Sequence, residues 1–381
     1  MIVTHRERFV RALNHEETDR VPLDLGGGPV SQIHQTAYDA LLDHLGLEPL
    51  EDAKAGQRLW QDVVPDERVL QRFDIDLRGV WTGQPDANPD TLLSPLEYRD
   101  EWGVVYRKAH ERGEWITEGS PLQQFDEPVP ADLDSIDWPD PTDPGRVRGL
   151  RERAERMRSE TDFAIVLNLE SGPLGTAQRM RGFTEILEDL LIHKSFVEAL
   201  FERTTDVICG IASAVLDEVG DLIDAITIAD DLGFQTQPYM APDLYRSLVK
   251  PHHVRVGDAI HSGTDAKFVL HSDGAIYTLI PDLIEAGVQV INPVQVSATG
   301  MDPAGLKREF GEDLGFWGAI DTHRLLPFGS PSEVAEGVRR TIGTLGAGGG
   351  YVLTSVHNVV AGVPPENVVA MFDTALEVRE A

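Results

Sequence analysis

The chain has 381 residues, 41% of them hydrophobic and 25% charged, which is typical of a globular protein and excludes a mainly disordered chain. Its 64 acidic residues outnumber its 33 Lys and Arg residues and give a formal net charge of −31, so we expect no nucleic-acid partner, because phosphate binding needs the opposite sign. No apolar run reaches the roughly 20 residues of a membrane helix and no apolar signal core is present, so we expect no membrane association and a cytoplasmic location.

The first part of the chain predicts two strands, three helices and an insertion. A helix is expected at 4–13, where Thr4 and Glu7 have the spacing of a capping box. Strands are expected at 21–25, before three glycines, and at 76–81, with helices at 33–45 and 67–73 between them. Residues 96–125 predict a β-hairpin around a polar turn at 110–113, and the Pro- and Asp-rich residues 126–145 predict an irregular connection. We therefore expect one domain, 1–381, with an insertion at 96–145.

From residue 146 onward, short apolar strands alternate with helices. Continuous apolar runs are typical of parallel strands that are buried on both faces. Six more strands bring the total to eight, which predicts the α/β class and a (β/α)8 barrel of the TIM type with the hairpin inserted before the third strand. An open doubly wound sheet is the alternative, but no dinucleotide or P-loop glycine motif follows any of the strands. The six strands are expected at 163–169, 225–229, 267–271, 288–291, 314–319 and 351–355, and the helices at 146–160, 174–192, 195–219, 243–261, 276–286, 302–310, 331–345 and 365–379.

Three residues at the strand ends predict a metal site. A barrel carries its chemistry where its strands end, and His271 and Asp273, two residues apart, project from the same side of an extended chain. His357 follows the last strand and completes a set that suits Zn²⁺, and also Fe²⁺ or Mn²⁺. In the alternative, the histidines only bond neighbouring carboxylates. Cys209 is the single cysteine, so a zinc site built from several cysteines of one chain is excluded.

Further polar residues at the strand ends are candidates for catalysis and binding. Glu170, Asp230 and His357 are the expected catalytic residues, as general bases or further ligands. Because neighbours on an extended chain face opposite ways, we expect Asp230 rather than Asp231 to point into the site, the alternative being a carboxylate pair that stabilises a helix N-terminus. For the glycine loop, close approach of a ligand and a plain tight turn both remain open. The expected substrate-binding residues are Gly27, His34, Trp81, Asn292, Gln295, Asp321 and Asn358.

Several motifs resemble those of the uroporphyrinogen decarboxylase superfamily. They comprise residues 4–13, 19–22, 230–235, 271–274, 292–295, 317–321, 357–358 and 363–367. The resemblance spans almost the whole chain and implies the same (β/α)8 barrel that the strand count predicts.

The superfamily contains two chemistries. Its uroporphyrinogen decarboxylases use arginines after the first strand to hold a polycarboxylated tetrapyrrole, and here no Lys or Arg lies between Arg20 and Lys54, so uroporphyrinogen is not expected as the substrate. Its cobalamin-dependent methyltransferases hold zinc with a His-x-Cys pair and a later cysteine. In this chain His271 matches that histidine, Asp273 stands in place of the cysteine, and His357 lies in the region of the late ligand.

The resemblance implies a metal-dependent, zinc-type methyltransferase. Its substrate would be a small methylated molecule or methylcobalamin, the partner would be a corrinoid protein, and the barrel would form a homodimer. Two alternatives stay open: a metal-free decarboxylase of a small carboxylate, with Asp230 or His357 handling protons, and a corrinoid- or metabolite-binding protein without turnover.

Overall fold

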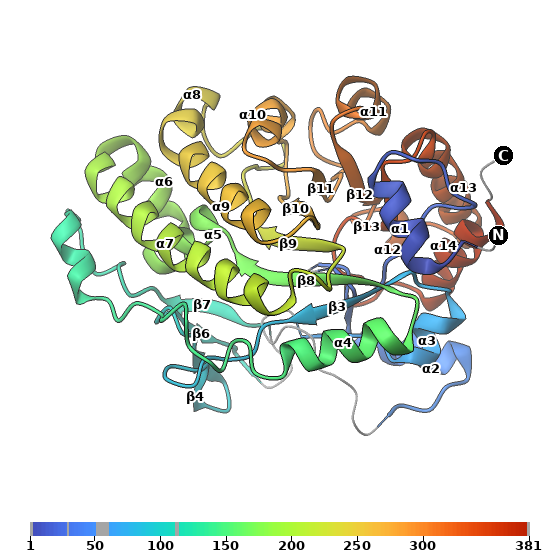
Figure 1. The fold of residues 1–381 in the computed structure, drawn as a ribbon, viewed down its shortest axis with the longest axis horizontal. Helices are drawn as coiled ribbons and strands as arrows, with labels where there is room; N and C mark the ends of the chain where they lie inside the picture. Colours follow the sequence, from blue (N-terminus) through green and yellow to red (C-terminus); the bar gives the residue numbers. More distant parts are fainter. Residues whose placement is uncertain (1–2, 29, 51–60, 111–113, 379–381) are drawn as a thin grey trace.

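The computed structural model describes residues 3–28, 30–50, 61–110 and 114–378, apart from the side chain of Glu170. Its centre is a parallel, curled sheet of seven strands in the order β13-β12-β11-β10-β9-β8-β3 (Figure 1). This confirms the α/β class and seven of the eight expected strands. The strands are β3 (Leu77–Trp81), β8 (Ala164–Ser171), β9 (Ala225–Ala229), β10 (Lys267–His271), β11 (Val290–Asn292), β12 (Gly315–Ile320) and β13 (Tyr351–Ser355).

The segment 21–25, expected as the first strand, is not a strand in the structure. It makes a single parallel bridge, between Leu23 and Leu353 of β13. On its other side, the N–H of Asp76 donates to the carbonyl of Leu23 at 3.0 Å. Pro22 has no N–H to donate, which limits the ladder that this segment forms. The segment nevertheless lies between the two outermost strands of the curled sheet.

Helices cover the outer face of the sheet (Figure 1). Three long helices that the sequence predicts are interrupted. The one at 174–192 breaks at Gly182, whose φ is 107°, and those at 243–261 and 331–345 contain π-helical turns, η3 (Tyr245–Val249) and η5 (Ile342–Gly346). No helix in the described ranges is long and apolar enough to cross a membrane. The helices are α1 (His5–Leu13), α2 (Gln35–Leu45), α3 (Glu67–Arg72), α4 (Leu150–Glu160), α5 (Pro173–Arg181), α6 (Phe183–Ile192), α7 (Lys194–Val219), α8 (Pro242–Leu244), α9 (Lys250–Gly263), α10 (Ile280–Glu285), α11 (Pro303–Phe310), α12 (Leu325–Phe328), α13 (Pro331–Thr341) and α14 (Pro365–Glu377), with shorter turns η2 (Pro130–Ser135), η4 (Tyr277–Leu279) and η5 (Ile342–Gly346).

The insertion is an antiparallel sheet of four strands, larger than the predicted hairpin. Its order is β4-β5-β6-β7, and the stacked rings of Tyr98 and Tyr106, 4.8 Å apart, join its two central strands. Part of the expected turn, 111–113, lies outside the described residues. The strands are β4 (Thr91–Ser94), β5 (Glu97–Arg99), β6 (Val105–Arg107) and β7 (Ile116–Gly119), and a further pair, β1 (Ile33–His34) and β2 (Asp62–Val63), is also antiparallel.

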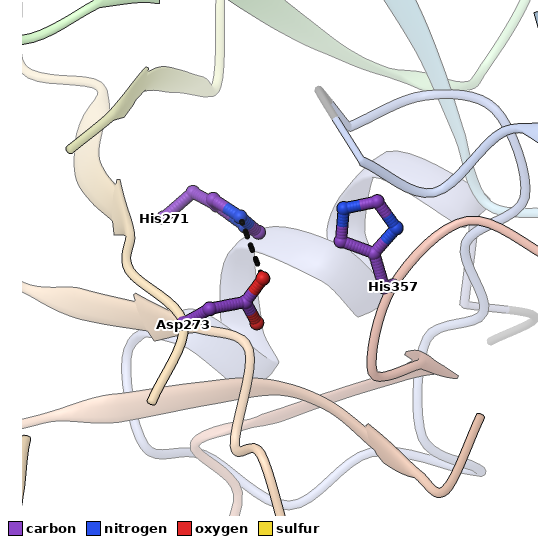
Figure 2. A group of neighbouring side chains, drawn as sticks. All are labelled: His271, Asp273 and His357. Carbon is purple, nitrogen blue, oxygen red and sulfur yellow. Dashed lines mark ion pairs between the residues drawn. The ribbon is translucent and has the colours of Figure 1, made fainter. Parts of the chain in front are cut away.

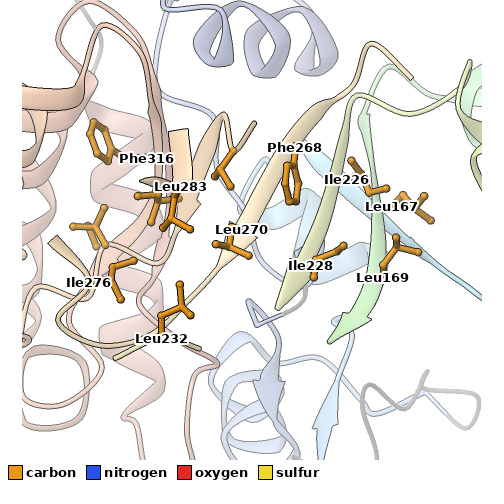
Figure 3. Packing of buried hydrophobic residues seen from close by; sticks show 14 of the residues in the cluster. Leu167, Leu169, Ile226, Ile228, Leu232, Phe268, Leu270, Ile276, Leu283 and Phe316 are labelled. Carbon is orange, nitrogen blue, oxygen red and sulfur yellow. The ribbon is translucent and has the colours of Figure 1, made fainter. Parts of the chain in front are cut away.

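Apolar side chains fill both faces of the central sheet. Outside it, residues such as Leu167, Ile226 and Phe268 pack under the helices (Figure 3). Inside it, Phe9 of α1 packs edge-on against Trp317 with ring centroids 5.5 Å apart, so α1 closes the end where the strands begin. The capping box predicted for this helix is present. The opposite end, where the strands finish, is left for polar side chains.

Candidate metal centre

His271, Asp273 and His357 come together at the strand ends. His271 is the last residue of β10, Asp273 follows by two residues, and His357 comes two residues after β13. Each offers one ligand atom, and all three atoms lie within 4.8 Å of one another. His271 Nε2 lies 3.8 Å from Asp273 Oδ2, and His357 faces them from the other side (Figure 2). Two imidazole nitrogens and one carboxylate oxygen are a common ligand set for a divalent metal ion.

The neighbouring strand fixes the orientation of His271. β10 and β11 pair in a register that puts Asn292 beside His271, and the two side chains meet with Nδ1 and Oδ1 2.6 Å apart. An amide oxygen only accepts, so Nδ1 carries the proton and donates it. The lone pair of Nε2 then points toward Asp273. A second partner of this kind is what holds a metal-binding histidine in the right tautomer.

Burial shifts the pKa of all three ligands. It lowers the pKa of His271 and of His357, so both rings are uncharged at neutral pH. Burial, and then the nearby charge of Asp231, raises the pKa of Asp273 to about 6. One oxygen of this carboxylate, Oδ1, is buried and bonds to no described residue. A cation bound by the three residues would offset the cost of burying the charge of this carboxylate, so the residues present fit a metal ion.

Of the aspartate pair after β9, Asp231 is the one that faces the centre. Its Oδ1 lies 3.9 Å from His271 Nε2 and accepts the N–H of Asp273 at 2.8 Å. Asp230 instead bonds His253 at 2.7 Å and the N-terminal N–H groups of α5 at Leu174 and Gly175. The expectation that Asp230 would point into the site was therefore wrong, because the start of α5 captures its carboxylate. A catalytic role for Asp230 or His357 stays a prediction, and the side chain of Glu170 lies outside what the structure describes.

A pocket of about 440 Å³ opens beside the ligands. It shares Asp273 and His357 with the metal centre, and none of its described lining residues is Lys or Arg. Such a volume suits a small molecule. The other lining residues are Gln295, Thr322, His323, Pro327, Phe328, Val356, Val360 and Ala361.

Two of the expected substrate-binding residues reach this region. Asn292 bonds His271, as described above, and Gln295 lines the pocket while its Oε1 accepts the N–H of Gly274 at 2.6 Å. Asp321 accepts the N–H groups of His323 and Leu325, so its carboxylate orders the turn before α12.

The remaining expected residues are engaged elsewhere. Asn358 bonds Asp62 and the N–H of Gln32, and the ring of His34 caps α2. A Cβ on Gly27 would lie 2.0 Å from Leu77 Cδ1, so packing explains this glycine better than ligand approach. Trp81 lies over Gly79 and lines a different pocket, of about 780 Å³. A role of these residues in substrate binding therefore stays a prediction.

Sequence reasoning missed His323 and Phe328 in the pocket and gave Asp231 too little weight. His323 follows the strand-end residue Asp321 by two positions, which is the spacing that singled out Asp273 after His271, so that signal was available. Phe328 carries no such pattern.

The sequence model of the family described as "Uroporphyrinogen decarboxylase (URO-D)" matches residues 115–378. No curated protein matches the chain. Among solved structures, a methyltransferase from Methanosarcina mazei is 17% identical, with a TM-score of 0.65, over 99% of this chain and 99% of that chain. A β-glucosidase from Pyrococcus furiosus is 11% identical, with a TM-score of 0.43, over 94% of this chain and 93% of that chain. At these identities, the methyltransferase comparison establishes a shared fold.

Proposed function

The chain belongs to the uroporphyrinogen decarboxylase family, and from this premise we propose that it is a metal-dependent methyltransferase of that family. The methyl group would come from a small methylated substrate or from a corrinoid carried by a partner protein. The fold shared with the Methanosarcina mazei methyltransferase supports this branch of the family. We also propose that 21–25 takes the place of the first strand in a (β/α)8 barrel, supported by its bonds to both outer strands.

The convergence of His271, Asp273 and His357 carries the proposal. Three separate features would have to be coincidental otherwise: ligand atoms within 4.8 Å, a histidine tautomer set by Asn292, and a buried carboxylate oxygen without a partner. A divalent ion bound there would act as a Lewis acid and lower the pKa of the group that accepts the methyl. Asp273 would balance part of its charge, while Asn292 keeps the proton of His271 away from the centre.

The pocket supports a small substrate. Its volume of about 440 Å³ is modest, and the described lining offers no guanidinium or ammonium group to pair with several carboxylates. Burying unpaired carboxylates would cost several kcal/mol each. A polycarboxylated tetrapyrrole therefore fits this pocket poorly.

One observation favours a second candidate, metal-free decarboxylation of a small carboxylate. A carboxyl group whose pKa is raised to about 6, as for Asp273, could donate a proton to the carbanion that decarboxylation leaves. The neutral ring of His357 lies next to it. Release of CO₂ that persists in excess chelator would favour this candidate over the first.

Metal analysis tests the proposal. Protein purified without a histidine tag should hold about one equivalent of zinc or another divalent metal, and His271→Ala should lose it. His34→Ala is the matched control, because this ring caps a helix away from the centre. Wild-type protein that takes up no stoichiometric metal, or a His271→Ala variant that takes up as much as wild type, would overturn the proposal.

A further inference from the structure

An apolar wall stands beside the candidate metal ligands. Phe328 is 83% exposed and Val360 is 41% exposed, and both line the pocket that contains Asp273 and His357. Pro327 and Ala361 also line this pocket, and the four residues together are called the apolar wall below. Single exposed apolar residues are common on proteins, but a group of them in one pocket marks a binding surface.

The backbone that carries Phe328 is braced on both sides. The amide of Asn367 donates to the carbonyls of Leu326 and Gly329, each at 2.8 Å. The N–H of Phe328 donates to the carbonyl of Arg324 at 3.0 Å. Leu326 is fully buried beneath. The exposed ring is therefore presented by an ordered turn, which lowers the entropy lost when a ligand packs against it.

The rest of the pocket limits the charge of the ligand. Asp273 and the nearby Asp231 are carboxylates, and no described lining residue is Lys or Arg. The amide nitrogen of Gln295 bonds to no described residue and is one neutral donor of the lining, as is the hydroxyl of Thr322. An anionic group placed away from the metal would meet no cation there.

We propose that Phe328 and Val360 form an apolar subsite that binds the alkyl or aryl group of a small, otherwise uncharged molecule whose donor atom binds at the metal. This rests on the proposed metal centre of His271, Asp273 and His357. The subsite selects ligands by the apolar area they bury against the ring, and the carboxylates reject ligands that carry a further negative charge.

Cobalt-substituted protein allows a direct test, because its visible absorption changes when a thiol binds the metal. Three thiols serve as probes: phenylmethanethiol, 2-mercaptoethanol and 3-mercaptopropane-1-sulfonate. The first carries an aryl group where the second carries a hydroxyl group, so we expect phenylmethanethiol to bind about tenfold more tightly, as burial of an aryl group predicts. The third carries a negative charge on a sulfonate, which is a poor metal ligand, and should bind most weakly.

Variants test whether Phe328 causes the tighter binding of phenylmethanethiol. Phe328→Ala should lower the affinity for phenylmethanethiol about tenfold and leave the affinity for 2-mercaptoethanol unchanged. Phe328→Leu should keep most of the affinity for phenylmethanethiol. Leu191→Ala is the control, because Leu191 is an exposed apolar residue of α6 outside the pocket, 66% exposed. Failure to bind cobalt would overturn the metal centre itself. Cobalt binding with no preference, or a preference that survives Phe328→Ala, would overturn only the subsite.

Discussion

Asp230 and His253 form a fully buried pair, with Oδ2 and Nε2 2.7 Å apart. The other nitrogen of the ring lies 2.8 Å from the hydroxyl of Tyr245, so the three side chains join η3 and α9 to the end of β9. Asp231, the next residue, has a side chain that is 42% exposed at the metal centre. Adjacent aspartates thus serve different purposes, one in the packing of the fold and one at the site.

This difference predicts separable effects of two substitutions. Asp230→Ala leaves His253 and two N–H groups of α5 without their acceptor and should lower the free energy of unfolding by about 2–4 kcal/mol. Asp231→Ala should change it by less than about 1 kcal/mol, because the side chain is partly exposed. It should weaken metal binding about tenfold, since the N–H of Asp273 loses its acceptor. Urea unfolding and metal titration of both variants check this, and a stable Asp230→Ala protein would contradict it.

Much of the fold could be predicted because apolar runs and their polar flanks mark buried parallel strands. β9, β10 and β13 have the expected bounds. β4 was missed because all four of its residues are exposed and give no alternating pattern. The break at Gly182 depends on a positive φ that the continuous apolar pattern of 174–192 conceals.

The site was predicted in part, for a physical reason. His271 and Asp273 could be paired because the alternation of an extended chain continues two residues past β10. The same rule failed at Asp230, because the chain has left β9 and the N–H groups of α5 bind its carboxylate. The place of Phe328 in the pocket could not be predicted, because it depends on which distant segments of the chain meet around the pocket.

Asn292 should affect the metal rather than the fold. Asn292→Ala removes the acceptor that holds the proton on Nδ1 of His271, so metal affinity should fall about 10- to 100-fold. Asn168→Ala is the matched control: this buried amide bonds Thr227 and the carbonyl of Gly27, away from the three ligands. Competition with a chelating dye measures both affinities. Equal affinities in the two variants would show that the His271 tautomer does not depend on Asn292.

Asp62 should make stability depend on pH. Burial raises its pKa to about 7, and Asn358 is its side-chain partner. The folded protein therefore keeps this proton to a higher pH than the unfolded chain, in which the carboxyl has its usual pKa of 3.8. The contribution of Asp62 to stability accordingly falls as pH rises from about 4 to about 7 and is constant above.

Asp62→Asn removes this dependence because an amide does not titrate, while its oxygen can still accept from Asn358. The variant should unfold like wild type near pH 4 and be more stable at pH 8, by at most about 4 kcal/mol. Urea unfolding at both pH values is the measurement. Asp265→Asn, at an exposed position, should match wild type throughout. A stability difference for Asp62→Asn that does not grow with pH would contradict the buried, protonated carboxyl.

Gly27 should be required by packing. A Cβ at this position would lie 2.0 Å from Leu77 Cδ1 and 3.1 Å from Asp24 Oδ1, so Gly27→Ala should destabilise the protein by about 1–3 kcal/mol. Leu77→Ala opens that space but itself destabilises the protein. The double variant should therefore be more stable than the sum of the two single effects predicts. Metal content should be unchanged in all three. Additive effects in the double-mutant cycle, or a loss of metal in Gly27→Ala alone, would mean that this glycine serves the site instead.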